Sequence, residues 1–304
     1  MTNVIVTTTI NPPTKAIKLF DALPGWHLVV IGDQKTPPDY HLGNGTYLGP
    51  AEQEKIDKTL SDLIGWNCIQ RRNFGLLVAR EMGAEIVAVV DDDNIPYDWW
   101  GSDLLIGRPI EARVFSTSLP AFDPVGATNY PHLWHRGYPL QLLPKRDYST
   151  STRKVIQAEV QADFWNGDPD VDAICRMQFA PNCMFDPAIF PISADAISPF
   201  NSQNTFLAGR VLKDYFLFPY IGRMDDIWAS YYVQAKGATV VFAAPSVVQE
   251  RNEHDLVADM KREYLGYENN LALLEAMRDD PDALFAYLPK QAVAAFLRYR
   301  AHFE

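Results

Sequence analysis

The segment Glu85-Ile-Val-Ala-Val-Val-Asp-Asp-Asp-Asn94 decides the fold prediction, because an unbroken apolar run passes directly into three adjacent aspartates. A short apolar run without polar alternation is typical of a strand buried on both faces of a parallel sheet. Ligands of such sheets bind beyond the carboxyl ends of the strands. The segment therefore predicts an α/β protein with a mainly parallel central sheet and a ligand site at residues 91–94. A solvated acidic turn or a cluster of helix N-caps is the alternative.

Two further strands are expected upstream. Residues 3–9 form a β-branched run, and residues 27–31 form an apolar run that ends in Gly32-Asp33. Between them, residues 14–23 show helical spacing with Thr14 as a plausible N-cap. Strand, helix and strand in this order predict a right-handed βαβ unit with parallel strands.

Downstream, helices are expected over residues 50–63, 71–82 and 226–236, and a strand over 238–243. Residues 100–170 mix aromatic residues, prolines and short strand patterns. From Asp255 onward the pattern is helical, with breaks near Pro281 and Pro289. We expect one α/β catalytic domain over residues 1–254 and a helical C-terminal extension over 255–304 that packs on it.

Composition limits the classes of function. The chain has 304 residues, 27 Lys and Arg against 38 Asp and Glu, and a net charge of −11. This acidic balance argues against nucleic-acid partners, which need basic surfaces. It is compatible with a nucleotide ligand whose charge a metal neutralises. The three cysteines are too few and scattered for a disulfide framework, so buried reduced thiols are expected.

Neither a targeting segment nor a membrane span is predicted. Met1 leads directly into an apolar strand without a basic region. No apolar run approaches the roughly 20 residues that a membrane helix needs. A soluble, cytoplasmic protein is therefore expected.

The strand ends indicate a site for a metal and a nucleotide. Along an extended backbone, Asp91 and Asp93 point to one side and Asp92 to the other. Carboxylates so close together repel one another unless a cation lies among them, and oxygen ligands favour Mg²⁺ or Mn²⁺ over zinc. The neighbouring strand ends carry Thr8, Thr9 and Asp33, which suit a nucleoside pocket. The Asp33 carboxylate can accept a hydrogen bond from a base or ribose, or bond its own turn.

Several motifs resemble two related families. Residues 8–14, 25–37 and 91–94 look like the STELLO-type glycosyltransferases. Similarity to the reversibly glycosylated polypeptides, the UDP-arabinopyranose mutase family, is carried by Arg72-Asn-Phe-Gly75, Arg136-Gly-Tyr-Pro139, Ile221-Gly-Arg-Met-Asp-Asp-Ile-Trp-Ala229 and Lys261-Arg-Glu-Tyr264. Both families have GT-A-type, Rossmann-like folds that use nucleotide sugars, and the resemblance covers most of residues 3–267.

The resemblance implies a metal-dependent glycosyltransferase. Such an enzyme moves a sugar from a nucleoside diphosphate, with UDP favoured, to a glycan or small-molecule acceptor that the motifs do not identify. It uses Mn²⁺ or Mg²⁺. By this resemblance Asp93 binds the metal, Asp91 contacts ribose or sugar, and Asp92 lies between them in the nucleotide-sugar site. His254 is a candidate metal ligand, although the mutase histidine lies nearer Glu250; a surface histidine is the alternative.

Further site residues follow from the same comparison and from residue chemistry. Arg71 and Arg72 open a helix, where two cations oppose the macrodipole. They could clamp diphosphate oxygens, and a solvated helix start is the alternative. Asp225 and Asp226 are candidates for the catalytic base, with Asp226 preferred, or simple helix caps. Arg223 lies beside them and is expected near the sugar.

Arg136 has two interpretations. In the mutase family the arginine of this motif is linked to reversible self-glycosylation, whereas its permanent charge suits phosphate binding. The mutases carry a second arginine seven positions later, where this chain has Leu143. This departure weakens the mutase interpretation. A UDP-sugar pyranose/furanose mutase and a non-catalytic nucleotide-sugar-binding subunit remain alternatives to the transferase, and a homo-oligomer is compatible with all three.

Overall fold

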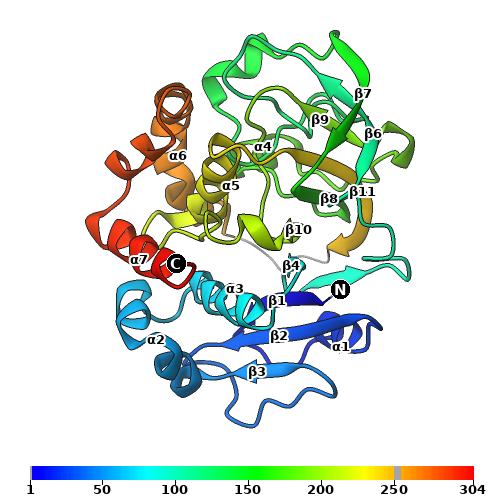
Figure 1. Cartoon of the computed structure of the whole chain (residues 1–304). Helices are drawn as coiled ribbons and strands as arrows, with labels where there is room; N and C mark the ends of the chain where they lie inside the picture. Colours follow the sequence, from blue (N-terminus) through cyan, green and yellow to red (C-terminus); the bar gives the residue numbers. More distant parts are fainter. Residues whose placement is uncertain (1, 250–254) are drawn as a thin grey trace.

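The computed structural model describes residues 2–249 and 255–304, and it confirms a mixed α/β architecture around one large sheet (Figure 1). The N-terminal half of this sheet is parallel, in the order β3-β2-β1-β4. Its strands are β1 (Asn3–Thr9), β2 (Trp26–Gly32), β3 (Thr46–Leu48) and β4 (Ile86–Val90). Every residue of β4 is buried, as expected of a central parallel strand.

The second half of the sheet differs from the prediction of a mainly parallel sheet. Five of the ten strand pairings among the described residues are antiparallel. The reversal begins at β10, which pairs antiparallel with both β4 and β8. The remaining strands are β5 (Asn94–Pro96), β6 (Pro109–Phe115), β7 (Ser151–Gln157), β8 (Val160–Gly167), β9 (Ile192–Ala194), β10 (Asn204–Ala208) and β11 (Val240–Gln249). Most of them lie in or beside the part of the sequence without readable periodicity.

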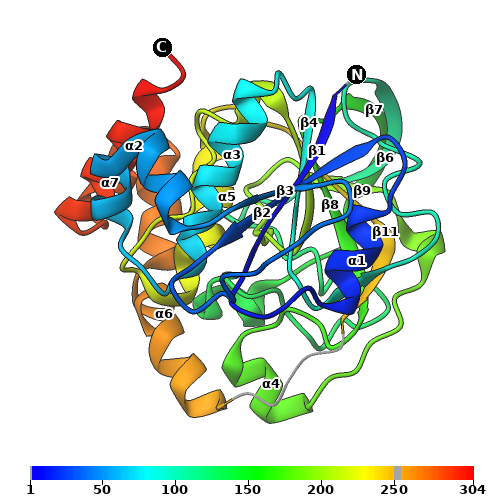
Figure 2. The ribbon, with the colours of Figure 1, turned by 90° about the horizontal axis from the view of Figure 1, so that it is seen from below.

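Helices cover both faces of the sheet. Figure 2 shows α1 and α3 on opposite sides of β1 and β2. The predicted N-cap of α1 is confirmed, because the Thr14 side chain accepts a hydrogen bond from Ile17 N at 3.2 Å. The helices of the N-terminal half are α1 (Lys15–Asp21), α2 (Pro50–Ile64), the 3₁₀ turn η1 (Ile69–Arg71) and α3 (Arg72–Glu81).

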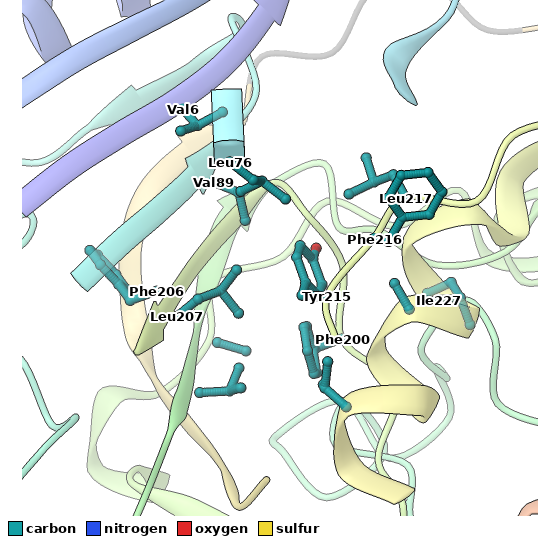
Figure 3. Packing of buried hydrophobic residues seen from close by; sticks show 14 of the residues in the cluster. Val6, Leu76, Val89, Phe200, Phe206, Leu207, Tyr215, Phe216, Leu217 and Ile227 are labelled. Carbon is teal, nitrogen blue, oxygen red and sulfur yellow. The ribbon is translucent and has the colours of Figure 1, made fainter. Parts of the chain in front are cut away.

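The middle of the chain supplies short turns and one long buried helix. These elements are η2 (Leu140–Lys145), α4 (Ala173–Phe179), η3 (Pro187–Ile189), η4 (Gly209–Val211), η5 (Gly222–Met224) and α5 (Asp225–Ala235). Trp228 and Tyr232 in α5 are both fully buried. Figure 3 shows Ile227 of α5 in the same core as Tyr215, Phe200 and the strand residue Leu207. The start of α5 is therefore anchored in the same core as β10.

The C-terminal residues are helical, as predicted from Asp255 onward. They form α6 (Leu256–Met277), η6 (Pro281–Ala286) and α7 (Lys290–Ala301). α6 packs on η5 and α4, and α7 lies along α2 in both views (Figures 1 and 2). The buried Asp57 carboxylate in α2 accepts hydrogen bonds from Arg298 Nε at 2.6 Å and His302 Nε2 at 2.8 Å. Because one hydrophobic core runs from β1 to α7, a separate C-terminal extension remains a proposal.

The predictions about membrane spans and cysteines can be compared with the structure. Across residues 2–249 and 255–304, no helix combines the length and apolar character needed to cross a membrane. All three cysteines are free thiols. Cys175 and Cys183 are buried as predicted, and burial raises the pKa of each to about 12. Cys68 is only half-buried.

Close packing of α3 on β1 generates a stability prediction. A Cβ at Gly75 would lie 2.3 Å from Val6 Cγ1 and 3.2 Å from Ile31 Cγ1. We expect Gly75→Ala to lower the free energy of unfolding by about 1–3 kcal/mol through overpacking, although alanine favours helix by about 1 kcal/mol. The measurement is urea denaturation.

A double-mutant cycle with Val6→Ala provides the control. Removing the Val6 methyl groups makes room for the added Cβ, so the double variant should be more stable than the sum of the single changes predicts. A Gly75→Ala protein as stable as the parent would show that α3 can move away from β1 without loss.

Candidate active site

Two adjoining cavities lie where β1, β2 and β4 end. The first, of about 360 Å³, is named here the strand-end cavity. It is lined by Thr8, Thr9, Ile10, Asn11, Ile31, Asp33, Asn67, Cys68, Ile69, Arg71 and Asp92. The second, of about 390 Å³, is named the acidic cavity. It is lined by Asn67, Cys68, Ile69, Gln70, Asp91, Arg136, Ser202, Gln203, Gly222, Arg223, Asp225, Asp226 and Arg262. The shared residues 67–69 make the two cavities neighbours.

Asp33 ties the end of β2 to the loop shared by the cavities. Its Oδ1 accepts from Gln34 N at 2.6 Å and Asn67 N at 2.9 Å, and its Oδ2 accepts from Cys68 N at 3.1 Å. The predicted bond to its own turn is thus present. The carboxylate also lines the strand-end cavity, and Oδ2 has room for a second donor.

The three aspartates form a turn rather than a continued strand. β4 ends at Val90, and Asn94 N bonds back to Asp91 O at 3.4 Å. Asp91 and Asp92 nevertheless point to different sides, as predicted, since Asp91 lines the acidic cavity and Asp92 the strand-end cavity. Asp92 Oδ2 accepts from Thr9 Oγ1 at 2.5 Å. Asp93 lies half-buried in the same turn.

Arg72 fixes the first aspartate. Its Nη2 lies 2.7 Å from Asp91 Oδ1, and its Nη1 donates to Ser202 O at 2.6 Å and Ser202 Oγ at 2.9 Å. Burial raises the pKa of Asp91, although the Arg72 guanidinium opposes that rise. Two cations at a helix start were expected to need a nearby anion. For Arg72 that anion is the Asp91 carboxylate and not a ligand.

Arg71 points away from Arg72, so the two do not form the expected paired clamp. The Arg71 side chain is fully buried; its Nε donates to Gln53 Oε1 at 2.8 Å and its Nη1 donates to Ser61 Oγ at 3.0 Å. Its guanidinium stacks on the Trp66 ring at 3.7 Å. Burial lowers the pKa of Arg71 to about 10. The solvated helix start is excluded for both arginines, and Arg71 still lines the strand-end cavity.

Arg136 lies at the floor of the acidic cavity between two buried aspartates. It contacts Asp170 through Nε at 3.0 Å and Nη2 at 2.8 Å, and Asp226 through Nη1 at 2.9 Å and Nη2 at 3.0 Å. Nη1 also donates to the Arg223 carbonyl. All five N–H groups of the guanidinium thus have protein acceptors. This differs from the expected phosphate-binding role, because no N–H is left for an anion.

The acidic pair at the start of α5 divides into two different carboxyl groups. Burial alone would raise the pKa of Asp226, but Arg136 and the Ser202 amide outweigh it and hold the pKa below its usual range. Burial and the neighbouring Asp226 raise the pKa of Asp225 to about 7. Gln70 Nε2 donates to Asp225 Oδ2 at 2.6 Å. Asp225 is therefore the carboxyl group of the pair whose pKa lies near neutrality, whereas the sequence analysis preferred Asp226 as the base.

Several residues of the site were not predicted. Asp170 and Ser202 hold Arg136 and Asp226. Asp170 ends the stretch of residues 100–170 that mixes short patterns, and Ser202 lies outside every predicted element. Arg223 was predicted near the sugar and does line the acidic cavity. Its Nε is 2.8 Å from Glu263, which belongs to the Lys261–Tyr264 motif. The family-like spacing of that motif was the available signal for Glu263.

The donor set for a metal is incomplete within the described residues. Residues 2–249 and 255–304 contain no group of three or more His, Cys, Asp and Glu side chains placed to hold an ion. His254 and Glu250 lie outside the described residues. Mg²⁺ usually takes one or two carboxylates together with water and substrate phosphates. Asp91 lines the acidic cavity, where Arg72 already occupies one of its oxygens, whereas Asp93 lines neither of the two cavities.

The buried ion pairs of Arg136 with Asp170 and Asp226 should make the stability of the protein depend on pH. Arg136→Met would leave Asp226 buried without its cation and Asp170 with Arg223 at 3.6 Å, so the free energy of unfolding at pH 7 should fall by about 3–5 kcal/mol. The pKa of Asp226 is depressed in the folded protein. Its stabilising contribution is therefore present above the unfolded pKa near 3.9 and is lost as pH falls through the folded value.

The stability difference between parent and variant should consequently be smaller at pH 3 than at pH 7, measured by urea denaturation. Arg153→Met is the matched control, because the Arg153–Glu111 pair is 3.0 Å long but exposed on both sides. It should change stability by less than about 1 kcal/mol. An equal loss for the Arg136 variant at both pH values would contradict this account of the cluster.

Comparison with known proteins finds two curated relatives from Arabidopsis thaliana. The probable glycosyltransferase STELLO2 is 22% identical over 182 residues, which are 56% of this chain and 24% of the relative. The probable glycosyltransferase STELLO1 is 24% identical over 185 residues, with the same shares. The expected resemblance to STELLO-type proteins is confirmed, while the chain spans about a quarter of their length. No protein-family model matches the chain.

Solved structures are more distant. Glucosyl-3-phosphoglycerate synthase from Mycobacterium tuberculosis, solved with Mn²⁺, UDP-glucose and phosphoglyceric acid, is 12% identical over 89% of this chain and 80% of its own, with a TM-score of 0.45. The mannosyltransferase PcManGT from Pyrobaculum calidifontis, solved with GDP-mannose and Mn²⁺, is 13% identical over 99% and 73%, with a TM-score of 0.40. The similarity that carries weight is in sequence: over slightly more than half its length, the chain is similar to proteins named as probable glycosyltransferases.

Proposed function

We propose that this chain is a GT-A-type, metal-dependent glycosyltransferase that takes a nucleoside diphosphate sugar, with UDP favoured, and transfers the sugar to a glycan or small-molecule acceptor. One observation carries the proposal: two cavities adjoin at the carboxyl ends of parallel strands, and adjacent aspartates of one turn line both of them. Open parallel sheets bind nucleotides at this position. The sequence similarity to the STELLO proteins supports the same activity.

The strand-end cavity suits the nucleoside. Asp33 and Asp92 offer carboxylate oxygens, and Thr8 and Thr9 offer hydroxyl groups. The sugar then lies in the acidic cavity near Asp91 and Arg223. In this arrangement Asp92, rather than Asp91, is the better candidate for the ribose contact.

In this arrangement the turn of Asp91, Asp92 and Asp93 lies between the nucleoside in the strand-end cavity and the sugar in the acidic cavity. We place Asp93 and Asp91 as the ligands of Mn²⁺ or Mg²⁺, with His254 as a third candidate outside the described residues. When bound, the ion neutralises the charge that develops on the departing diphosphate. Arg72 holds Asp91 at 2.7 Å and so limits its movement.

Proton transfer is assigned to Asp225. A base works best when its pKa lies near the operating pH, and the pKa of Asp225 is raised to about 7. Asp226 is bound by Arg136 through both oxygens and also accepts from Ser202 N at 3.0 Å. We therefore give Asp226 a positioning role at the floor of the cavity and Asp225 the role of accepting the acceptor's proton.

The mutase alternative is less favoured. Self-glycosylation at Arg136 requires a guanidinium nitrogen that can act as a nucleophile. Arg136 is buried, its pKa is raised well above the usual value by Asp170 and Asp226 despite burial, and all its N–H groups are bonded. The residue at position 143 is a leucine. Only a measurement of turnover distinguishes the transferase from a non-catalytic nucleotide-sugar-binding subunit. A cytoplasmic location and a homo-oligomer remain predictions.

The first test separates the two aspartates of α5. Asp225→Asn should lower hydrolysis of a UDP-sugar about 10²–10⁴-fold while UDP affinity stays within about twofold. In the parent, turnover should fall about tenfold per pH unit below pH 7, because Asp225 must be deprotonated to act. The Asn variant should lose this acid limb.

Asp226→Asn serves as the comparison variant. It should chiefly lower the free energy of unfolding, because the buried Arg136 loses half of its carboxylate partners. If Asp225→Asn hydrolysed the UDP-sugar at the parental rate with the parental pH profile, the assignment of the base would be withdrawn.

The second test addresses the metal. Calorimetry should show UDP affinity falling at least about tenfold, or 1.4 kcal/mol, when EDTA replaces Mn²⁺. Asp93→Ala should reproduce the effect of EDTA. Asp147→Ala is the control, because Asp147 is an exposed loop carboxylate that bonds Ser149. Equal affinity with Mn²⁺ and with EDTA would remove the metal from the site.

A further inference from the structure

A third cavity, of about 220 Å³, lies over β8 and β11 and shares no lining residue with the strand-end or acidic cavity. Its walls come from the middle of both strands, which lie side by side in the sheet (Figure 1), and from the loop that follows β5. We propose that this cavity binds a small organic ammonium ion, primary or quaternary, with Asp163 as the counter-ion and Trp99 as the aromatic surface.

Asp163 is a buried carboxyl group without a cationic partner. It lies on β8, is 6% exposed, and accepts a hydrogen bond from Gln161 Nε2 at 2.7 Å. Among residues 2–249 and 255–304, no Lys, Arg or His forms an ion pair with it. Burying a charge without a partner is unfavourable, and burial raises the pKa of Asp163 to about 7 although Ser246 and Gln161 oppose the rise. A cation entering the cavity would supply the missing partner.

The charged groups facing Asp163 do not replace that partner. Asp103, in the loop over β8, is a second carboxylate and raises the pKa of Asp163 further. Its own charge is paired with Arg108 Nη2 at 2.6 Å, on the exposed side of the loop. The electrostatic potential inside the cavity is therefore negative when Asp163 is ionised. The overall charge of −11 acts in the same direction.

Hydrogen-bonding capacity favours a cation over a sugar. Gln161 uses both ends of its amide, because Oε1 accepts from Leu105 N at 2.7 Å while Nε2 donates to Asp163. Ser246 Oγ accepts from Asn204 Nδ2 at 2.9 Å. A sugar presents many hydroxyl groups that would each need a partner in a buried site. Asp163 is thus the main polar group still available to a ligand.

The walls favour an organic cation over a metal ion. Leu105, Phe190, Pro191 and Ala243 line the cavity, whereas Mg²⁺ or Ca²⁺ needs six or more oxygen ligands. Trp99 lines the mouth with 59% of its surface exposed, and its ring stacks on Tyr97 at a centroid distance of 4.6 Å. An indole face attracts ammonium ions. The volume is below the roughly 300–1,000 Å³ of drug-sized sites, which limits the ligand to a small ion.

The test is titration calorimetry of the full chain with choline and with butylammonium. The neutral isostere 3,3-dimethyl-1-butanol and methyl glucoside are the comparison ligands. We expect both cations to bind with a Kd below about 10 mM, and each neutral compound to bind at least about tenfold more weakly. Choline affinity should rise roughly fivefold to tenfold from pH 6 to pH 8, because the carboxyl group deprotonates over this range.

Asp163→Asn should abolish the preference for the cation and its pH dependence, with an unchanged melting temperature or a higher one. Asp103→Asn is the matched control and should alter choline affinity by less than about threefold, because that carboxylate is already paired. Trp99→Ala should weaken choline several-fold without affecting UDP binding. Equal binding of choline and its neutral isostere, binding of methyl glucoside alone, or no binding of either cation would overturn the proposal. UDP binding in the same samples reports separately on the nucleotide site.

Discussion

The buried guanidinium of Arg136 is the interaction on which the site depends. Asp170 precedes α4, Asp226 begins α5, and Arg136 comes from a third segment, so one side chain joins parts of the chain that are 34 and 90 residues apart. Two carboxylates at this depth need cations beside them; Arg136 bonds both, and Arg223 Nη2 also lies 3.6 Å from Asp170. Burial and the negative charge of Asp226 beside it keep the pKa of Asp225 raised, while Arg136 keeps the pKa of Asp226 low. The same ion pairs therefore create both an inert carboxylate and a titratable one.

The parallel half of the fold and the first wall of the site were predictable from local sequence. Residues 3–9, 27–31 and 85–90 are continuous apolar or β-branched runs, and burial on both faces of a parallel sheet requires such runs. Asp33 and the aspartates after Val90 then necessarily meet at one edge, because parallel strands end together. Thr14 could be predicted as a helix cap because capping is a local interaction: its hydroxyl group accepts from an amide only three residues away.

The rest could not be predicted, because it depends on long-range pairing. The antiparallel position of β10 follows from its register with β4, more than 100 residues earlier, and no local period signals it. Arg71 and Arg72 are adjacent and identical in sequence, but their side chains point in different directions. Arg71 bonds Gln53 in α2, whereas Arg72 pairs with Asp91. The sequence also could not tell that Arg136 pairs with Asp226 and not with Asp225, because that pairing joins residues 90 positions apart.

The contact between α7 and α2 has a consequence for ligand binding. Asp57 in α2 is held by Arg298 and His302, and the same helix supplies Gln53 and Ser61, which orient Arg71 at the strand-end cavity. Docking of the last helix and binding in that cavity therefore involve one shared element. By thermodynamic reciprocity, a ligand that orders α2 tightens the docking of α7 by the same free energy that docked α7 contributes to the ligand's affinity. Amide hydrogen exchange in residues 290–301 would then report on occupancy of the strand-end cavity.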